Sequence, residues 1–246
     1  MKKRLDQLLV EKGHFISRTK AQAAILVGVV YVNNQKACKA GEMINPESSI
    51  EIKGAPHPYV SRGGVKLEQA LKDFKIKVEG KTVMDVGAST GGFTDCLLKQ
   101  GAEKVYAVDV GYGQLDWKLR QDPRVRVIER KNIRYLTLED LDLNDSDIEL
   151  CTIDVSFISL AKVLPAVHAL IKNRAEVIAL IKPQFEARRE QVGKGGIVRD
   201  DKIHQEVIEK VKTTAEKTGF QAKAIIKSPI TGTDGNVEFF IHLLKS

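Results

Sequence analysis

The sequence has few of the residues on which disulfide frameworks and metal centres depend. Its three cysteines are odd in number and far apart, which suits neither paired disulfides nor the close ligand pairs of a zinc site. Cys38, Cys96 and Cys151 are therefore interpreted as small apolar residues of the core. The five histidines show no ligand spacing either. We expect neither a disulfide nor a bound metal.

Long hydrophobic runs are missing as well. The longest, at residues 23–32 and 177–181, fall well short of the roughly 20 apolar residues that a membrane-spanning helix needs. The first residues are basic, but Asp6, Glu11 and Lys12 interrupt what would have to be the continuous apolar stretch of a secretion signal. We therefore predict a cytoplasmic protein without a membrane partner.

The residues that are present are typical of a folded, basic protein. Hydrophobic residues make up 43% of the chain and charged residues 29%, with a net charge of +7. The first sixty residues hold nine Lys or Arg against five Asp or Glu, so positive charge is concentrated there. A basic face often means only a solvated surface, but a concentrated excess favours a nucleic-acid partner. The length of 246 residues suggests two modules.

Residues 3–53 are predicted to form a small module of two helices followed by short strands. Apolar residues at helical spacing predict a first helix that ends at Gly13. Ser17 is a suitable N-cap for a second helix that ends at Gly28. Beyond it, the sequence VVYVNNQKA predicts a hairpin that turns at its two asparagines.

Two cations occupy the first turn of the second helix, where the helix dipole disfavours them. A helix N-terminus offers free N–H groups to anions, so Arg18 and Lys20 beside it suggest a site for an RNA phosphate. A solvated basic pair is the alternative. The stretch RLDQLLVEKGHFISRTKAQAAILVGVVYVNNQ resembles the S-four-like, or αL, RNA-binding domain. The resemblance implies binding to structured RNA and assigns Arg4, Ser17, Arg18 and Lys20 to the interface.

The rest of the chain alternates predicted helices and strands. Residues 1–54 and 62–246 are predicted as two domains, joined by a Gly- and Pro-containing linker at 55–61. The predicted helices are 63–75, 92–100, 114–120, 159–172 and 201–218, and the predicted strands are 82–87, 104–110, 125–130, 149–155, 177–183, 221–228 and 236–244. Such apolar strands predict a mostly parallel α/β sheet with helices on both faces and ligands at its carboxyl edge.

A glycine-rich turn, MDVGASTGGFTD, follows the first of these strands. Gly87, Gly91 and Gly92 allow a tight turn, and Asp109 follows Asp85 by 24 residues, where a ribose hydroxyl pair would be met. The turn MDVGASTGGFTD itself contains neither Gly-x-Gly-x-x-Gly nor Gly-Lys-Ser/Thr. It therefore favours a ribose-bearing ligand without pyrophosphate, of which S-adenosylmethionine is the commonest on this fold. A purely structural turn is the alternative.

Four charged residues are expected at one cleft. Asp154, Lys182 and Glu238 lie in apolar strand segments, where a charge is costly unless it is paired. We expect them at or near the carboxyl ends of these strands, close to Lys66 on the preceding helix. Each alone is consistent with a structural ion pair. Together they alternate in sign around the predicted ligand site.

This arrangement resembles the FtsJ-like ribose 2'-O-methyltransferases, whose catalytic set is Lys, Asp, Lys, Glu in chain order. RGGVKL, TIDVSF, LIKPQFE and GNVEFF supply Lys66, Asp154, Lys182 and Glu238. The resemblance gives Lys182 the task of deprotonating a ribose hydroxyl or stabilising its alkoxide. Lys66 would be a neighbouring cation, Asp154 would orient Lys182, and Glu238 would anchor Lys66 or the ribose.

The resemblance also implies a cofactor site and an expected fold. The fold is a Rossmann-like, S-adenosylmethionine-dependent methyltransferase domain that follows a small S-four-like domain. The residues assigned to the cofactor are Asp85, Gly87, Ala88, Gly91, Gly92, Phe93, Asp109, Asn132 and Asp154. Fusion of the two domains, with DVGASTGGFTD and KPQFE, is most similar to the TlyA family of ribosomal-RNA methyltransferases, which often carry the label hemolysin.

A basic, glycine-containing segment, EARREQVGKGGIVRD, follows Lys182. It is either a plain loop or a flap that closes on RNA, and Arg62, Arg188, Arg189 and Lys194 are predicted RNA contacts. Trp117 and Phe157 are expected to pack rather than to stack on bases.

The leading hypothesis is an enzyme that methylates ribosomal RNA, free or in assembled subunits. A non-catalytic RNA-binding assembly factor and a secreted cytolysin are the alternatives. The first alternative predicts salt-sensitive RNA binding without cofactor affinity. The second finds little support in a sequence that lacks both a secretion signal and a membrane segment.

Overall fold

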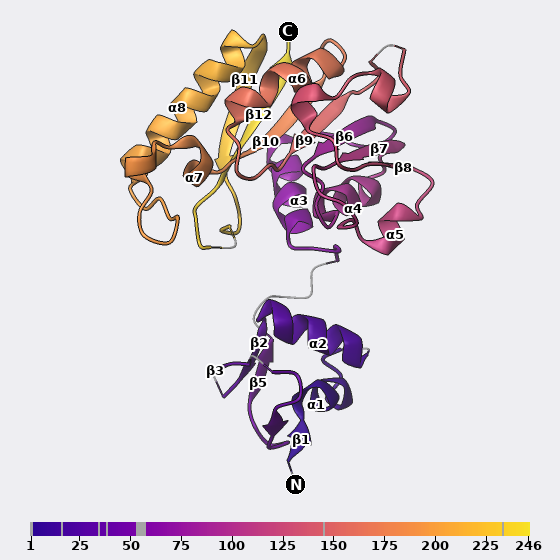
Figure 1. Ribbon diagram of the computed structural model, residues 1–246, viewed down its shortest axis with the longest axis vertical. Helices are drawn as coiled ribbons and strands as arrows, with labels where there is room; N and C mark the ends of the chain where they lie inside the picture. The colour runs from indigo at the N-terminus through magenta and orange to yellow at the C-terminus, as the bar shows by residue number, and fades with distance from the viewer. Residues whose placement is uncertain are drawn as a thin grey trace. The chain divides into compact units, whose positions relative to one another are not determined.

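The computed structural model divides the chain into two compact units, Met1–His57 and Pro58–Ser246. The structure describes residues 2–15, 17–33, 35–37, 39–52, 58–144, 146–232 and 234–246. Residues 55–57 of the predicted linker, Asn34 of the predicted hairpin turn, and Cys38 lie outside the described residues. Each unit is described by itself (Figure 1).

The first unit consists of two helices and short strands. The strands follow the helices as predicted, except for β1, which precedes them. Its elements are β1 (Lys3–Arg4), α1 (Leu5–Glu11), α2 (Arg18–Val27), β2 (Val30–Val32), β3 (Gln35–Lys36), β4 (Met43–Ile44) and β5 (Ile50–Ile52). The Ser17 side chain accepts a hydrogen bond from the Lys20 backbone N–H, and Gly28 ends α2 in the left-handed conformation. Both ends of the helix therefore use the residues expected to cap it.

The second unit is built on a seven-stranded sheet of order β11-β12-β10-β9-β6-β7-β8. The strands are β6 (Thr82–Val86), β7 (Lys104–Val108), β8 (Val125–Ile128), β9 (Leu150–Ile153), β10 (Glu176–Ile181), β11 (Phe220–Lys227) and β12 (Phe239–Lys245). The five strands from β10 to β8 are parallel, whereas β12 runs antiparallel to both β10 and β11. The sheet is mostly parallel, as predicted.

The helices of this unit mostly follow the predicted ranges. They are α3 (Gly63–Phe74), α4 (Gly92–Lys99), α5 (Trp117–Arg120), α6 (Leu164–Leu170), α7 (Pro183–Glu186) and α8 (Asp201–Lys217), with short 3-10 turns at Ile133–Tyr135, Glu139–Leu141, Leu160–Lys162 and Arg189–Gln191. The helix predicted for 159–172 is instead a 3-10 turn followed by α6. Pro165 lies at the start of α6, and because proline has no N–H it cannot continue a helix from the preceding turn.

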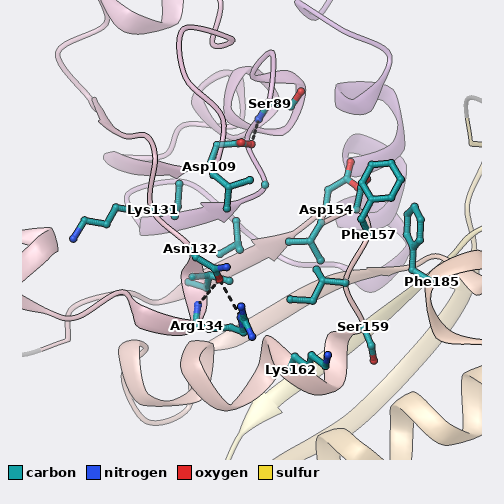
Figure 2. Close-up of a pocket in the computed structure, with 18 of the residues that line it drawn as sticks. Ser89, Asp109, Lys131, Asn132, Arg134, Asp154, Phe157, Ser159, Lys162 and Phe185 are labelled. Carbon is teal, nitrogen blue, oxygen red and sulfur yellow. Dashed lines mark hydrogen bonds between the residues drawn. The ribbon is translucent and has the colours of Figure 1, made fainter.

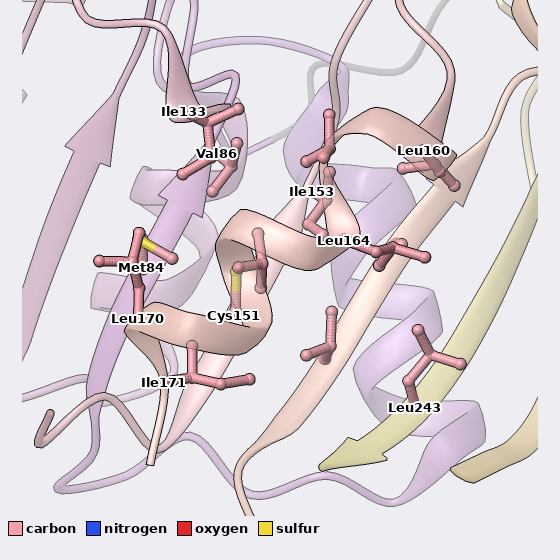
Figure 3. Close-up of a cluster of buried hydrophobic side chains, with 14 of the residues drawn as sticks. Met84, Val86, Ile133, Cys151, Ile153, Leu160, Leu164, Leu170, Ile171 and Leu243 are labelled. Atoms are coloured by element: carbon pink, nitrogen blue, oxygen red, sulfur yellow. The ribbon is translucent and has the colours of Figure 1, made fainter. Parts of the chain in front are cut away.

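Helices cover both faces of the sheet and bury two apolar clusters. Along β6, Val83 belongs to the cluster under α3 and α4, whereas Met84 belongs to the cluster under α6 and α8, as expected from the alternation of side chains in a strand. Figure 3 shows the second cluster, in which Cys151 is fully buried beside α6. Cys96 is buried in the first cluster, so both described cysteines are core residues.

No helix within the described ranges is both long enough and apolar enough to cross a bilayer.

Candidate functional site

The glycine-rich turn after β6 requires glycine at Gly87. Its φ of +87° lies in the left-handed region, and an added Cβ would be 2.4 Å from the backbone oxygen of Asp154. A side chain would therefore be both strained and blocked by backbone. The absence of a side chain lets the turn after β6 pack directly against the segment that follows β9.

Asp85 holds this turn from inside the sheet. Its side chain is fully buried and accepts hydrogen bonds from Thr94 Oγ1 at 2.7 Å and Thr152 Oγ1 at 2.9 Å. Burial raises the pKa of Asp85 to about 6, against the opposing effect of the two hydroxyl donors. Asp85 lines neither cavity at this edge, so the structure places it as a support for the turn rather than as the predicted cofactor contact.

A cavity of about 1030 Å³ opens at the carboxyl edge of the parallel strands (Figure 2). Asp109, one residue after β7, accepts hydrogen bonds from the backbone N–H of Ser89 at 2.8 Å and of Gly111 at 2.7 Å. These contacts fix its carboxylate at the cavity wall. Asn132 also lines the cavity, and its side-chain oxygen accepts a hydrogen bond from the Arg134 backbone N–H at 3.1 Å. We call this space the donor cavity, after the methyl donor that the sequence predicts at this edge of the sheet.

A second, smaller cavity of about 270 Å³ contains the four predicted charged residues. They are Lys66, Asp154, Lys182 and Glu238, and the predicted residues Arg62, Gly87, Ala88, Gly92 and Phe93 also contribute to its lining. The two cavities share three lining residues, which are Gly87, Ser89 and Asp154. The smaller space, which we call the acceptor cavity, therefore adjoins the donor cavity at the glycine turn.

The four charges form two ion pairs. Lys66 Nζ is 2.5 Å from Glu238 Oε2, and both side chains are buried. Lys182 Nζ is 2.6 Å from Asp154 Oδ1 and donates a hydrogen bond to Ser156 Oγ at 2.9 Å. Asp154 Oδ1 is buried and accepts no hydrogen bond, so the lysine contacts it as an ion pair. Ser156 was not predicted from the sequence.

The position of Glu238 differs from the prediction. Glu238 precedes β12, which begins at Phe239, and so does not lie at the carboxyl end of a strand. Because β12 is antiparallel to β10, its start lies at the same edge of the sheet as the end of β10. Glu238 therefore reaches Lys66 from the start of an antiparallel strand. Asp154 and Lys182 directly follow β9 and β10, as expected.

Trp117 and Phe157, which were expected to pack rather than to stack on bases, both lie at the surface. Trp117 is 71% exposed and Phe157 is 91% exposed. Phe157 lines the donor cavity, has a φ of +62°, and its ring centroid is 5.0 Å from that of Phe185 (Figure 2). A strained backbone that displays an aromatic ring at a cavity indicates a functional constraint, which apolar residue type alone did not signal.

The basic residues of the first unit have an internal partner that the sequence did not reveal. Asp6 is fully buried and accepts hydrogen bonds from Arg4 Nε at 3.1 Å, from Arg18 at 2.9 Å and from Gln22 at 2.7 Å. The hydrogen bond from Arg4 holds the pKa of Asp6 well below its usual range. Arg18 thus has a structural reason to lie in the first turn of α2, and Lys20 is exposed beside it.

The predicted basic segment of the second unit has exposed side chains, but its last part is hydrogen-bonded to the rest of the unit. Arg188, Arg189 and Lys194 are exposed outside both cavities. The segment's end is tied down by the buried Asn236, whose side chain accepts a hydrogen bond from Val198 N at 3.0 Å and donates one to the Gly196 oxygen at 2.9 Å. Among the described residues, no cluster of three or more potential ligands could hold a metal ion.

Comparisons with known proteins identify both units. The FtsJ-like methyltransferase family matches residues 59–245, and the S4 domain matches residues 3–50. The first match spans the sheet, both cavities and all four paired charges. The second spans the two helices and the short strands of the first unit as far as the first residue of β5.

Similar proteins match nearly the whole chain. "Putative rRNA methyltransferase YqxC" of Bacillus subtilis is 52% identical over 98% of this chain and 85% of its own length. "16S/23S rRNA (cytidine-2'-O)-methyltransferase TlyA" of Mycobacterium tuberculosis is 42% identical over 98% of this chain and 89% of its own. A solved "Putative hemolysin" from Streptococcus thermophilus is 46% identical, with a TM-score of 0.78 over 100% of this chain and 89% of that one.

Proposed function

Because this chain belongs to the FtsJ-like methyltransferase family and carries an S4 domain, we propose that it methylates ribose 2'-hydroxyls of ribosomal RNA. Relatives at 42% to 52% identity over 98% of the chain are named as rRNA methyltransferases. Its cofactor is S-adenosylmethionine, which supplies an electrophilic methyl group. We place the protein in the cytoplasm with ribosomal RNA or ribosomal subunits as its partner.

The donor cavity fits this cofactor. Its volume of about 1030 Å³ is at the upper end of the range for small-molecule sites. Asp109 presents a fixed carboxylate for the ribose hydroxyls, and Asn132 would contact the adenine. Gly87 lines both cavities, so its backbone would lie beside the methionine end of the cofactor.

The acceptor cavity would receive the target ribose. A ribose hydroxyl becomes a good nucleophile as its proton is lost, and a positioned ammonium stabilises the alkoxide that develops. Lys182 is suited to this role because Asp154 and Ser156 hold its ammonium where the two cavities adjoin. A lysine held this closely to a carboxylate acts mainly through its charge.

Lys66 and Glu238 would complete the cavity. Their ion pair is buried, and burial strengthens electrostatic interactions because solvent screening is weak there. Lys66 adds a second cation facing the alkoxide, while Glu238 fixes the lysine and offers an acceptor to a neighbouring ribose hydroxyl. The single observation that carries the proposal is that these two pairs, from four separate segments of the chain, line one small cavity beside the donor site.

The test measures methyl transfer from labelled S-adenosylmethionine to purified ribosomal subunits. Lys182→Ala is expected to lower the rate by about 10²- to 10⁴-fold, the usual contribution of a positioned proton-transfer or charged group, with cofactor affinity retained. Lys217→Ala, which removes an exposed lysine at the end of α8, serves as the control. Mapping the label in the RNA then identifies the modified ribose.

Two results would contradict the proposal. One is a wild-type protein that transfers no label to ribosomal RNA. The other is a Lys182→Ala variant as active as wild type. Tight RNA binding without cofactor affinity, measured by calorimetry, would favour the non-catalytic assembly factor instead.

A further inference from the structure

Two segments at the carboxyl edge of the sheet form one wall of the site. The first, residues 154–160, follows β9 and contains Asp154, Ser156 and Phe157. The second, residues 182–186, follows β10 and contains Lys182 and α7. Residues 154–159 of the first segment and Phe185 of the second line the donor cavity. Asp154 and Lys182 line the acceptor cavity.

Glu186, the last residue of α7, joins these two segments. Its side chain is only 4% exposed. One carboxylate oxygen accepts a hydrogen bond from Ser159 Oγ at 2.6 Å, and the other accepts one from the Leu160 backbone N–H at 2.6 Å. Burial raises the pKa of Glu186, and the two donors oppose that shift. A buried carboxylate is costly without partners, so these contacts fix the segment after β9 against α7.

A separate contact holds the backbone on which Glu186 stands. Lys210, on α8, donates a hydrogen bond from Nζ to the Glu186 backbone oxygen at 2.6 Å. Because this contact does not involve the Glu186 side chain, removal of the carboxylate leaves α7 attached to α8. The side chain can therefore be tested without releasing α7 itself.

The two segments are thus clamped at both ends. Lys182 contacts Asp154 and Ser156 at one end, and Glu186 contacts residues 159–160 at the other. Between the clamps, the Phe157 and Phe185 rings meet at 5.0 Å and the backbone of Phe157 is held at a φ of +62°. A strained residue persists only when its surroundings determine its conformation, and the Glu186 clamp lies two residues away.

We propose that Glu186 is a positioning residue that fixes residues 154–160 so that the donor-cavity wall and the Lys182 contacts form together. The inference rests on the proposed methyltransferase function and adds to it a residue that touches neither cavity. Loss of the Glu186 carboxylate leaves the Leu160 N–H without its partner. The wall then moves, and cofactor affinity and turnover fall together.

The test compares three variants with wild type. Glu186→Ala removes both acceptors. Ser159→Ala removes one donor to Glu186, together with the acceptor of the Ala161 N–H. Glu186→Gln keeps both contacts, because its amide oxygen accepts from the Leu160 N–H and its amide nitrogen donates to Ser159 Oγ. Glu209→Ala removes an exposed glutamate of α8 and is the matched control. Each protein is measured well below its melting temperature, so that differences do not arise from unfolding.

Three quantities are measured on each variant. These are the dissociation constant for S-adenosylmethionine by calorimetry, kcat with ribosomal subunits, and hydrogen exchange of the peptide that contains Leu160. Glu186→Ala is expected to raise the dissociation constant and lower kcat about tenfold each, the equivalent of one lost hydrogen bond to a charged group. Exchange at Leu160 becomes faster. Glu186→Gln stays within about twofold of wild type, and Ser159→Ala lies between them.

A purely structural Glu186 would lower the melting temperature but leave affinity, kcat and Leu160 exchange unchanged in the folded protein. That result would overturn the inference, as would a Glu186→Gln variant that behaves like Glu186→Ala. Should Glu186→Ala not fold, Ser159→Ala tests the inference through Leu160 exchange, because Ser159 itself lines the donor cavity and its loss also acts on the cofactor directly. A wild-type protein without cofactor affinity would instead overturn the methyltransferase proposal, whereas Leu160 exchange tests the clamp independently of catalysis.

Discussion

At the scale of single residues, two buried carboxylates respond to their surroundings in opposite ways. The donors to Asp85, two hydroxyls and the Thr94 backbone N–H, are neutral, and burial raises its pKa to about 6. Asp6 has two arginines, and its pKa is held well below the usual range, chiefly by the Arg4 hydrogen bond. Asp85 therefore favours the fold at low pH, whereas Asp6 favours it once its carboxyl group is ionised.

The Asp85→Asn variant tests the contribution of Asp85 to the pH dependence of stability. Between pH 3.8, its ordinary value, and about 6, the folded protein keeps a proton at Asp85 that the unfolded chain has released. The free energy of unfolding therefore falls as pH rises through this window, by at most about 1.4 kcal/mol per pH unit from this group. Asp85→Asn is expected to remove that contribution, measured by denaturant unfolding across the window.

Asp73→Asn is the control for this measurement, since Asp73 is exposed on α3. The control is expected to keep the wild-type pH dependence. An Asp85→Asn protein with the same pH dependence as wild type would show that Asp85 titrates at an ordinary pKa in the fold.

At the scale of elements, the turn between β6 and α4 decides whether the two cavities can adjoin. Its backbone touches the segment after β9 at Gly87, and Asp109 after β7 accepts the Ser89 N–H from the same turn. Three neighbouring strands, β7, β6 and β9, thus converge on one loop. In open α/β sheets, ligands bind outside the carboxyl ends of the strands where the strand order reverses, which in this sheet is between β6 and β9.

Gly87→Ala is expected to lower both stability and cofactor affinity. The left-handed φ costs a non-glycine residue about 1–3 kcal/mol, and the new Cβ also meets the Asp154 oxygen at 2.4 Å. Gly80→Ala is a matched control, because Gly80 has a φ of +70° and no atom within 4 Å of an added Cβ.

Denaturant unfolding and calorimetry with S-adenosylmethionine separate the two effects. Gly80→Ala should show the cost of strain alone, with normal cofactor affinity. Equal stability losses in the two variants, together with intact cofactor binding by Gly87→Ala, would refute the close packing of the turn.

At the scale of the whole molecule, RNA recognition and methyl transfer are assigned to separate units. The S4 match ends at residue 50 and the methyltransferase match begins at residue 59. In the first unit, Asp6 holds Arg4 and Arg18 together while each arginine stays about half exposed. Two ordered, solvent-facing guanidinium groups are suited to neighbouring phosphates of an RNA backbone.

Arg4→Ala and Arg18→Ala should therefore weaken RNA binding without changing cofactor affinity. Each is expected to reduce the slope of log affinity against log salt concentration by about one, the value for one lost phosphate contact. Binding to ribosomal subunits is measured over a salt series, with Lys217→Ala as a charge-matched control. An unchanged slope in both arginine variants would exclude these side chains from the phosphate contacts.

Much of this protein was predictable from local patterns. The helices of the first unit, the parallel strands and the glycine turn follow from periodicity and capping residues, which act over a few neighbouring positions. The family resemblance extended this to the two-domain organisation and to a shared cleft for Lys66, Asp154, Lys182 and Glu238. For Asp154 and Lys182 the position in the sequence was sufficient, because the carboxyl ends of neighbouring parallel strands meet at one edge. Lys66 and Glu238 were placed in the cleft by the resemblance alone.

The remaining features depend on contacts between distant parts of the chain. The buried partner of Arg18, the direction from which Glu238 enters, the exposure of Phe157 and the bridge from Glu186 to Ser159 all depend on strand order and loop packing. Residue type and spacing do not encode which side chains meet across 12 or 27 positions. The sequence by itself determined the elements and the chemistry available, and its family resemblance named the partners of Lys66 and Lys182. Tertiary packing decided the partners of Arg18 and Glu186, because those contacts are set by distance in space.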